Sequence, residues 1–171
     1  FITVHGLKTP SLFKNIFEGH KLTQVMNAFN DEGSEFGEGG ELRSSATYYG
    51  PAYMIAAIDN EAAGFLHSSI QLVSHVPIDK DSFMLRHGVK VQNIPHLSEE
   101  ENRAVVAEYT KMTQLSFKQD VDIWHNKFRV DNPLLCDGDG PLHKLREWYD
   151  QFYMDRISVP EKLKIRKEYT V

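Results

Sequence analysis

The sequence predicts an α+β domain in which an antiparallel sheet carries one long helix. Residues 42–94 form a run of strand-like segments, and residues 98–128 form one capped helical segment. A chain that completes most of its strands before its long helix is typical of the α+β class. With 171 residues and 41% hydrophobic content, the chain is long enough for one domain with a core of its own.

The strand region consists of four segments rich in aromatic and β-branched residues, and turn residues separate them. They read "LRSSATYYG", "PAYMIAAID", "GFLHSSIQLVSHVPI" and "SFMLRHGVKVQNI". Their short connections predict an antiparallel meander. Ahead of them, residues 10–30 carry apolar side chains at helical spacing around a Gly19–His20 break. Residues 30–41 are acidic and glycine-rich, which predicts a mobile surface loop.

The helix predicted after the strands has a start signal and a stop signal. Ser98 and Glu101 fit the capping box, in which each side chain binds a backbone N–H at the helix start. The helix should end near Phe128, because the residue before Pro133 disfavours helical backbone. A second helix is predicted for "PLHKLREWYDQFY", with proline at its start. The basic segment "EKLKIRKEY" is interpreted as a solvated helix face.

Composition excludes several classes of function. A net charge of −5 argues against a nucleic-acid surface. A single cysteine, Cys136, excludes a disulfide framework and an iron–sulfur cluster held within this chain, and it favours a reducing, cytoplasmic location. No apolar run approaches the ~18 residues of a membrane span. The chain starts at Phe1, in the middle of a pattern, so we expect a fragment whose N-terminal part is missing.

Asp120, in "SFKQDVDIWHNK", lies among aromatic residues of the predicted helix. At ~100° per residue, Phe117, Trp124 and Tyr109 fall within about 60° of Asp120, whereas Asp122 falls about 200° away. Asp120 is therefore predicted to face the protein interior. A carboxylate in such a place is either paired with a basic side chain or bound to a cation, and both alternatives stay open here.

Histidines could complete a metal site with Asp120, but spacing does not choose among the eight that are present. No pair shows the i, i+4 spacing of a helical metal motif. A lone histidine is more often structural than a ligand. We therefore take six of them as structural or surface residues: His67, His75, His87, His96, His125 and His143.

Several segments together resemble the catalytic domain of Rieske non-heme iron oxygenases. They are "FITVHG", "FKNIFEGHKLTQ", "TYYGPAYMI", "SFKQDVDIWHNKFRVDNPLL" and "DGPLHKLREWYDQFYMD". Among these oxygenases, the chain is similar to the oxygenase component of bacterial 3-ketosteroid 9α-hydroxylase. The animal cholesterol 7-desaturases carry a segment similar to "WYDQFY". The resemblance extends over almost the whole chain, and it implies a helix-grip fold, in which a curved sheet and a long helix enclose a ligand.

The resemblance also implies a site. Such oxygenases hold mononuclear Fe(II) with two histidines and one carboxylate, a set that leaves coordination positions open for oxygen. By this likeness, His5 and Asp120 are the metal-binding and catalytic residues, and a further histidine is expected just before Phe1. The steroid pocket of these proteins corresponds here to Gln24, Tyr48, Met54, Phe117 and Trp124. These residue types suit a flat, mostly apolar ligand, although plain core packing would use the same types.

By the same resemblance, residues 1–171 are part of a catalytic domain, and an N-terminal domain carrying a 2Fe–2S Rieske cluster is missing. The implied reaction hydroxylates a 3-ketosteroid ring at C9 during steroid or cholesterol degradation. It uses O₂ and electrons from a flavin and iron–sulfur ferredoxin reductase. The implied assembly is a homotrimer, and composition predicts no nucleic-acid partner and no membrane span. We expect residues 1–171 alone to be inactive.

Two departures from the 9α-hydroxylases leave the substrate and the carbon attacked open. They are "AAIDNEAAG" after "YYGPAYMI", and Ser74 where asparagine is frequent. A cholesterol 7-desaturase-like enzyme, or a Rieske oxygenase for another ring compound, is an alternative. A non-enzymatic helix-grip lipid carrier is a further one, although a carrier has no need of His5 and Asp120. The role of His20 does not follow from the sequence.

Overall fold

The computed structural model describes residues 12–30, 39–62 and 65–170, and it builds them around one antiparallel sheet. The sheet order is β6-β5-β4-β3-β2-β1-β7. The strands are β1 (Leu12–Glu18), β2 (Lys21–Phe29), β3 (Glu41–Tyr49), β4 (Tyr53–Ala62), β5 (Phe65–Pro77), β6 (Phe83–Val91) and β7 (Lys167–Thr170). The helices are α1 (Glu99–His125), α2 (Leu142–Asp150) and α3 (Glu161–Lys164). The predicted α+β class and antiparallel meander are confirmed.

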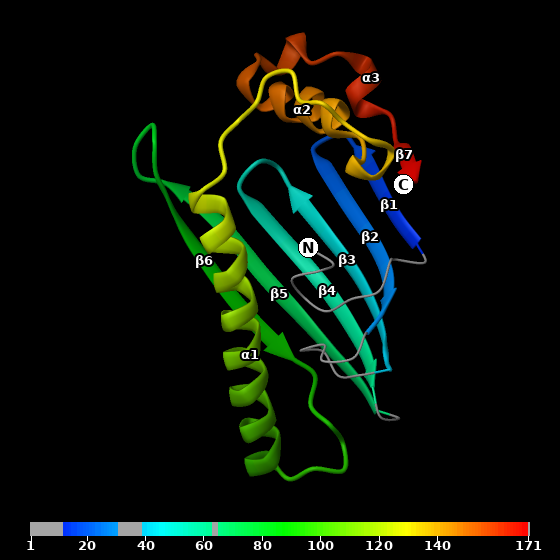
Figure 1. Ribbon diagram of the computed structural model, residues 1–171, viewed down its shortest axis with the longest axis vertical. Helices are drawn as coiled ribbons and strands as arrows, with labels where there is room; N and C mark the ends of the chain where they lie inside the picture. The colour runs from blue at the N-terminus through cyan, green and yellow to red at the C-terminus, as the bar shows by residue number, and fades with distance from the viewer. Residues whose placement is uncertain (1–11, 31–38, 63–64, 171) are drawn as a thin grey trace.

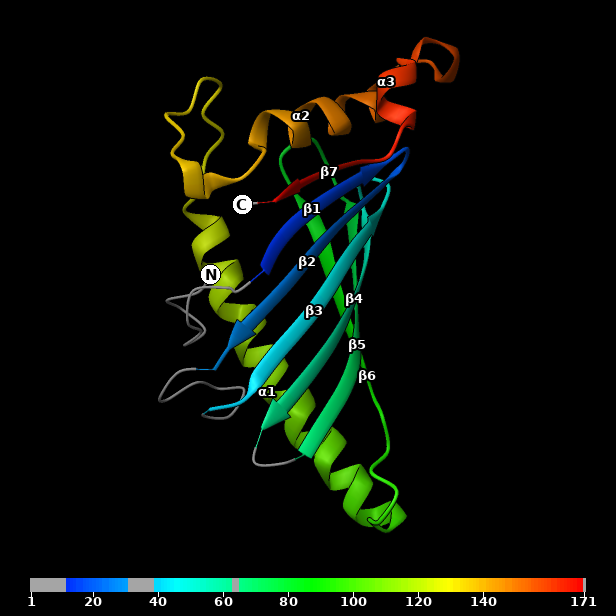
Figure 2. The same cartoon turned by 90° about the vertical axis from the view of Figure 1, so that its right-hand side faces the viewer.

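The helices lie on one side and at one end of the sheet. In Figure 1, α1 runs along the face of the sheet in front of β5 and β6, while α2 and α3 lie across the upper end. Figure 2 shows α1 and the sheet side by side, with α2 bridging their upper ends. Within the described ranges, no helix is both long and apolar enough to cross a membrane.

Residues 12–29 form a β-hairpin, so the helical spacing noted for this segment was misleading. Glu18 pairs with Lys21, which leaves Gly19 and His20 as a two-residue turn. Gly19 has φ +57°, a conformation that favours glycine and suits such a turn. The apolar residues do not alternate strictly because both faces of β1 are covered to some extent: Phe17 is buried and Ile16 is half-buried.

The long helix begins where the sequence predicts. The Ser98 hydroxyl accepts from the Glu101 N–H at 3.3 Å, and the Glu101 carboxylate accepts from the Ser98 N–H at 2.7 Å. The capping box is thereby confirmed. The helix ends at His125, slightly before the predicted end near Phe128. The predicted mobile loop at residues 30–41 falls largely on residues 31–38, outside the described part of the chain.

The second predicted helix exists as α2, and its side chains hold the ends of the sheet. Trp148 is 1% exposed and donates from Nε1 to the Gly19 carbonyl at 2.9 Å. Tyr149 donates to the Pro51 carbonyl at 2.6 Å, so α2 contacts both the β1–β2 and the β3–β4 turns. The Phe152 ring also packs against Trp148, with the ring centroids 4.9 Å apart. This segment is part of the "WYDQFY" sequence noted above.

The basic segment 161–169 is a helix only in its first part. After the single turn of α3, the chain extends as β7 and pairs with β1, from Lys14↔Thr170 to Phe17↔Lys167. Lys14 also forms an ion pair with Glu168 at 2.9 Å. The interpretation as a solvated helix face was therefore wrong for residues 167–169, which belong to β7. Local charge pattern could not reveal a strand whose partner lies about 150 positions earlier.

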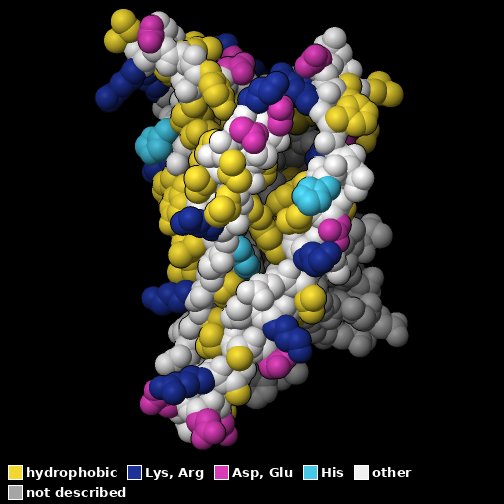
Figure 3. All heavy atoms as spheres, turned by 90° about the vertical axis from the view of Figure 1, so that its left-hand side faces the viewer, with side chains coloured by type: hydrophobic (Ala, Val, Ile, Leu, Met, Phe, Trp, Pro, Cys, Tyr) yellow, Lys and Arg dark blue, Asp and Glu magenta, His cyan; other side chains and the backbone are white. Residues whose placement is uncertain are grey.

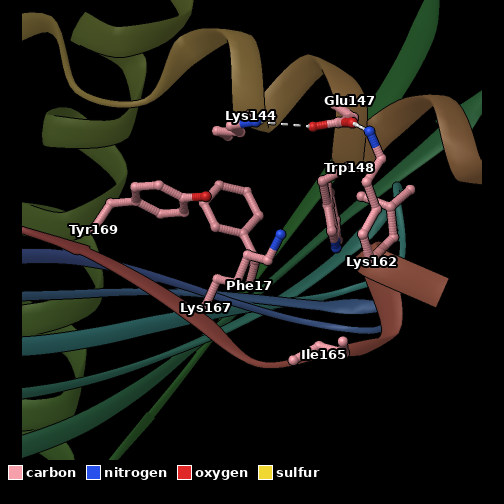
Figure 4. A pocket seen from close by; sticks show the side chains of 9 residues that line it. Phe17, Lys144, Glu147, Trp148, Lys162, Ile165, Lys167 and Tyr169 are labelled. Carbon is pink, nitrogen blue, oxygen red and sulfur yellow. Dashed lines mark hydrogen bonds and ion pairs between the residues drawn. The ribbon is translucent and has the colours of Figure 1, made fainter. Parts of the chain in front are cut away.

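A small cavity beneath α2 is too small for a substrate. It measures about 20 Å³, enough for roughly one water molecule. Figure 4 shows its aromatic floor of Phe17, Trp148 and Tyr169, and Glu147 between Lys144 and Lys162. These ion pairs lie at the protein surface. The cavity belongs to the packing of α2 and β7 on β1 and contributes no site.

Candidate functional site

Asp120 lies on the side of α1 that faces the sheet. Tyr109 and Thr113, on the same stripe, are buried, and both Phe117 and Asp120 are half-buried. The Tyr109 hydroxyl is 2.6 Å from the Ser69 hydroxyl of β5, which identifies the covered sheet face. The predicted inward orientation of Asp120 is therefore confirmed.

Asp122 provides the contrast on the same helix. Its side chain is 62% exposed and forms an ion pair with Lys118 at 2.8 Å, one helical turn earlier. Such exposed pairs contribute little to stability. Two aspartates separated by a single residue thus have different environments, and only Asp120 can reach a ligand beneath α1.

The described residues supply one member of the iron site expected by resemblance. His5 lies outside the described residues, and the described part of the chain brings no three His, Cys, Asp or Glu side chains together as a metal cluster. Asp120 makes an interaction of its own within the protein. A half-buried carboxylate on an inner face is compatible with Fe(II), whose oxygenase sites combine one carboxylate with two histidines. Asp120 therefore fits the expected group as its carboxylate ligand.

The register of the sheet places three of the predicted pocket residues on the face that α1 covers. Tyr48 pairs with Met54, Met54 with Val73, and Val73 with His87, and directly paired residues share a face. Ser69 lies on the same face, because it is two positions from Gln71 and four from Val73 along β5. Ser69 is the residue of β5 that contacts α1. Tyr48 and Met54 therefore point to the same side as Asp120.

Gln24 belongs to the next row on the same face. It pairs with Ala46, which pairs with Ala56, which pairs with Gln71. Two small alanines thus lie between two glutamines across the middle of the sheet. Gln24 itself is exposed, whereas Ala56 is buried and Ala46 is half-buried.

Phe117 and Trp124, the two predicted pocket residues on α1, contact each other. Their ring centroids are 5.7 Å apart with an interplanar angle of 90°, an edge-to-face arrangement. Trp124 is 42% exposed and also lines a hollow of about 500 Å³ at the end of α1, with Phe128, Val130, Pro133, Leu142, Lys127, Arg129 and Arg146. Figure 3, which looks at the β6 edge, shows hydrophobic side chains gathered in a depression between the sheet edge and α1.

Not every predicted pocket residue is a free lining residue. Tyr48 packs against the buried cluster of Phe17, Leu22 and Trp148, and burial raises the pKa of its hydroxyl. Core packing therefore accounts for part of its environment. Gln24 and Trp124 are exposed, and Met54 and Phe117 are half-buried like Tyr48, so the assignment of these residues to a ligand pocket stays a prediction.

Sequence reasoning missed a set of polar and aromatic neighbours on the same face. His87 stacks on Phe117 and lies 3.2 Å from the Gln71 amide oxygen. His67 packs edge-to-face on Tyr109, with ring centroids 4.5 Å apart. The available signal was the alternation in "HSSIQLVSH", which puts His67, Ser69, Gln71 and His75 on one face.

Acidification should destabilise the protein through these histidines. Burial lowers the pKa of His67, His75 and His87 below the ordinary value. Between the folded pKa values and about 6.5, the unfolded chain binds more protons than the native protein. The stabilisation is complete above about pH 6.5 and is lost as the pH falls toward the folded values. We expect a lower urea midpoint at pH 5.5 than at pH 7.5.

A variant and a control make this test specific. His67→Gln should reduce the difference between the two midpoints, because one titrating group is removed. His143→Gln, on the exposed side of α2, should leave that difference unchanged. Equal midpoints at both pH values in the unaltered protein would contradict the prediction.

Comparisons with known proteins agree with the resemblance. Residues 1–153 match the family described as "3-Ketosteroid 9alpha-hydroxylase C-terminal domain". A 3-ketosteroid-9-alpha-monooxygenase oxygenase component of Rhodococcus rhodochrous is 42% identical over 166 residues, which cover 95% of this chain and 44% of the relative. The protein of the same description from Mycobacterium tuberculosis is 37% identical over 177 residues, covering 100% of this chain and 45% of the relative.

A more limited match connects the chain to a different enzyme. The cholesterol 7-desaturase of Caenorhabditis elegans is 44% identical over 50 residues, or 29% of this chain and 11% of the relative. The chain spans less than half the length of each of these relatives.

Proposed function

The chain belongs to the 3-ketosteroid 9alpha-hydroxylase C-terminal domain family, and from this premise we propose that it is the catalytic domain of an oxygenase component that hydroxylates a 3-ketosteroid ring at C9. The observation that carries the proposal is the position of Asp120, half-buried on the sheet-facing side of α1, one helical turn from Phe117 and on the same side of the sheet as Met54 and Tyr48. The sheet and α1 would form a helix-grip fold around the ligand. The proposed process is the degradation of steroids or cholesterol.

In this proposal, Asp120 and His5 hold mononuclear Fe(II) together with a histidine from the preceding part of the polypeptide. When bound, the metal supplies O₂ activation, a chemistry that protein side chains lack. The Asp120 carboxylate contributes a negative charge and an oxygen ligand on a rigid helix. Because α1 is capped at Ser98 and packed through Tyr109 on β5, its inner face is fixed relative to the sheet.

The chain's own side chains would bind and orient the steroid. Phe117 and Trp124 offer flat apolar surfaces on α1, and Met54 offers a flexible apolar contact from β4. Gln24 and Tyr48 offer hydrogen-bonding groups for the polar ends of the ligand. An apolar slot of this kind excludes water from the reacting carbon.

The complete system would need further components. We propose that an N-terminal domain would hold a 2Fe–2S Rieske cluster as the source of electrons for the iron, and that a flavin and iron–sulfur reductase would be the partner that supplies them. The proposed working unit is a homotrimer. The lengths of the matching oxygenase components leave more than half of each outside the region covered here, which is enough for another domain.

The experiment uses the complete oxygenase with its reductase, a 3-ketosteroid and oxygen-18 gas. A 9α-hydroxylase gives a product that carries one labelled oxygen at C9, identified by mass spectrometry and NMR. The limited match to a cholesterol 7-desaturase makes desaturation the second candidate, and its product would lose two hydrogens without gaining label. A lipid carrier would bind the steroid and return it unchanged. Either of these two results would overturn the proposal.

A further inference from the structure

An aromatic array joins α1 to the edge strand β6. The imidazole of His87 lies parallel to the Phe117 ring, with an interplanar angle of 3° and ring centroids 4.7 Å apart. On α1, the Phe117 ring meets Trp124 edge-to-face at 5.7 Å. His87 is thus the sheet-side member of a series of three rings, two of which are proposed ligand contacts.

A hydrogen bond fixes His87 in this place. Its Nε2 is 3.2 Å from Oε1 of Gln71, and because an amide oxygen only accepts, Nε2 carries the proton in this pair. Burial lowers the pKa of His87, which keeps the ring neutral at neutral pH. The orientation of the imidazole is therefore set by β5 and not by solvent.

The strand register places His87 in the same row as Met54 and Tyr48, two of the proposed pocket residues. His87 pairs with Val73, which pairs with Met54, which pairs with Tyr48, so all four side chains lie in one row across the covered face. Phe117 lies one helical turn before Asp120 on the inner stripe of α1. The Phe117 ring therefore lies against His87 in this row and one helical turn from Asp120, the proposed metal ligand.

We propose that His87, held by Gln71, is a substrate-positioning residue that sets the plane of Phe117 and thereby decides which carbon of a fused-ring ligand faces Asp120. This inference rests on the proposed function. It adds that His87 determines which ring carbon of the ligand is hydroxylated. A flat ligand that packs against Phe117 takes its orientation from that ring. Losing the imidazole frees Phe117 to rotate, and the ligand then binds in more than one orientation.

The test compares variants of the complete oxygenase with its reductase. His87→Ala removes the ring, His87→Phe keeps a flat ring, and Gln71→Leu removes the hydrogen bond while keeping His87. The matched control is His75→Ala, because His75 is also half-buried on β5 but packs edge-to-face on Phe83, at 5.2 Å. Measurements are the steroid Kd by equilibrium dialysis, the distribution of hydroxylated products, and the fraction of consumed O₂ recovered in product.

For His87→Ala we expect a Kd about threefold to tenfold higher, the range that corresponds to the free energy of one aromatic pair. We also expect products hydroxylated at more than one carbon and a lower yield per O₂. His87→Phe should restore most of the affinity, and His75→Ala should leave the product distribution unchanged. A general loss of folding stability would lower the amount of active protein without changing which carbon is attacked.

Three results would overturn the inference. One is unchanged Kd and product distribution in a folded His87→Ala variant. Another is an equal change in His75→Ala, which would point to the sheet edge in general. If His87→Ala does not fold, Gln71→Leu decides, and an unaltered product distribution there overturns the inference. By contrast, an unaltered oxygenase that neither binds nor converts any 3-ketosteroid would overturn the proposed function itself.

Discussion

Replacing Asp120 with alanine is expected to remove iron from the oxygenase and to lower steroid hydroxylation by more than about 100-fold. This loss is larger than the loss usually caused by replacing a residue that only hydrogen-bonds to a metal ligand. Asp120 carries the one half-buried carboxylate of α1, whose other acidic side chains are exposed, and it lies one helical turn after Phe117. Without it, the proposed site would keep two histidines, and neutral nitrogen ligands alone would not balance the charge of Fe(II).

Asp122→Ala is the matched control for this experiment. It removes the same carboxylate two positions away, but from the exposed face, where the partner is Lys118. Iron per polypeptide, measured by elemental analysis, should fall in Asp120→Ala and stay unchanged in Asp122→Ala. Full iron loading of a folded Asp120→Ala variant would show that Asp120 is not a ligand, and a basic partner for Asp120 would become the better explanation.

The second large effect is expected for stability, at Trp148. Trp148→Ala should lower the free energy of unfolding by about 3–5 kcal/mol, because it empties a site in which the indole is almost fully buried. A domain of this size is commonly stable by only about 5–15 kcal/mol, so much of the chain would unfold at moderate temperature. Urea unfolding followed by far-UV circular dichroism measures this loss.

Two further variants separate packing from hydrogen bonding at this position. Trp148→Phe keeps an aromatic ring but loses the bond from Nε1 to the Gly19 carbonyl, and it should cost about 1 kcal/mol for that bond in addition to a smaller packing loss. Leu134→Ala, at a fully exposed side chain, should leave the urea midpoint unchanged. A small effect of Trp148→Ala, close to that of Leu134→Ala, would contradict the proposed role of α2.

Local signals predicted the parts of the fold that depend on neighbouring residues. The side chains of Ser98 and Glu101 each accept a hydrogen bond from the other residue's backbone N–H. Because the two residues lie within four positions, the start of α1 could be predicted from the sequence. The orientation of Asp120 and Asp122 followed from helical geometry, because a regular helix of 27 residues preserves its phase. The stop was less accurate, since Pro133 limits where a helix can continue but does not determine where it ends.

Other parts depend on contacts that no local pattern records. The apolar residues of 12–29 fit helical spacing about as well as strand spacing, and only the pairing with β3 and β7 decides between them. The same holds for residues 167–170, whose charges suit an exposed helix equally well. At the site, the contact between His87 and Phe117 joins β6 to α1, and the sequence separates them by 30 positions without any motif.

The position of β7 has a consequence for how the protein is made. Strand β1 is complete after residue 18, but the strand that covers its outer edge is not synthesised until residues 167–170, and the indole that binds its turn comes only at residue 148. During translation, β1 is therefore an uncovered edge with free N–H and C=O groups, open to pairing with another nascent chain. The long sequence separation of these contacts also predicts slow closure of this side of the sheet. Deleting residues 167–170 should increase aggregation during expression while leaving the opposite edge, at β6, as it is.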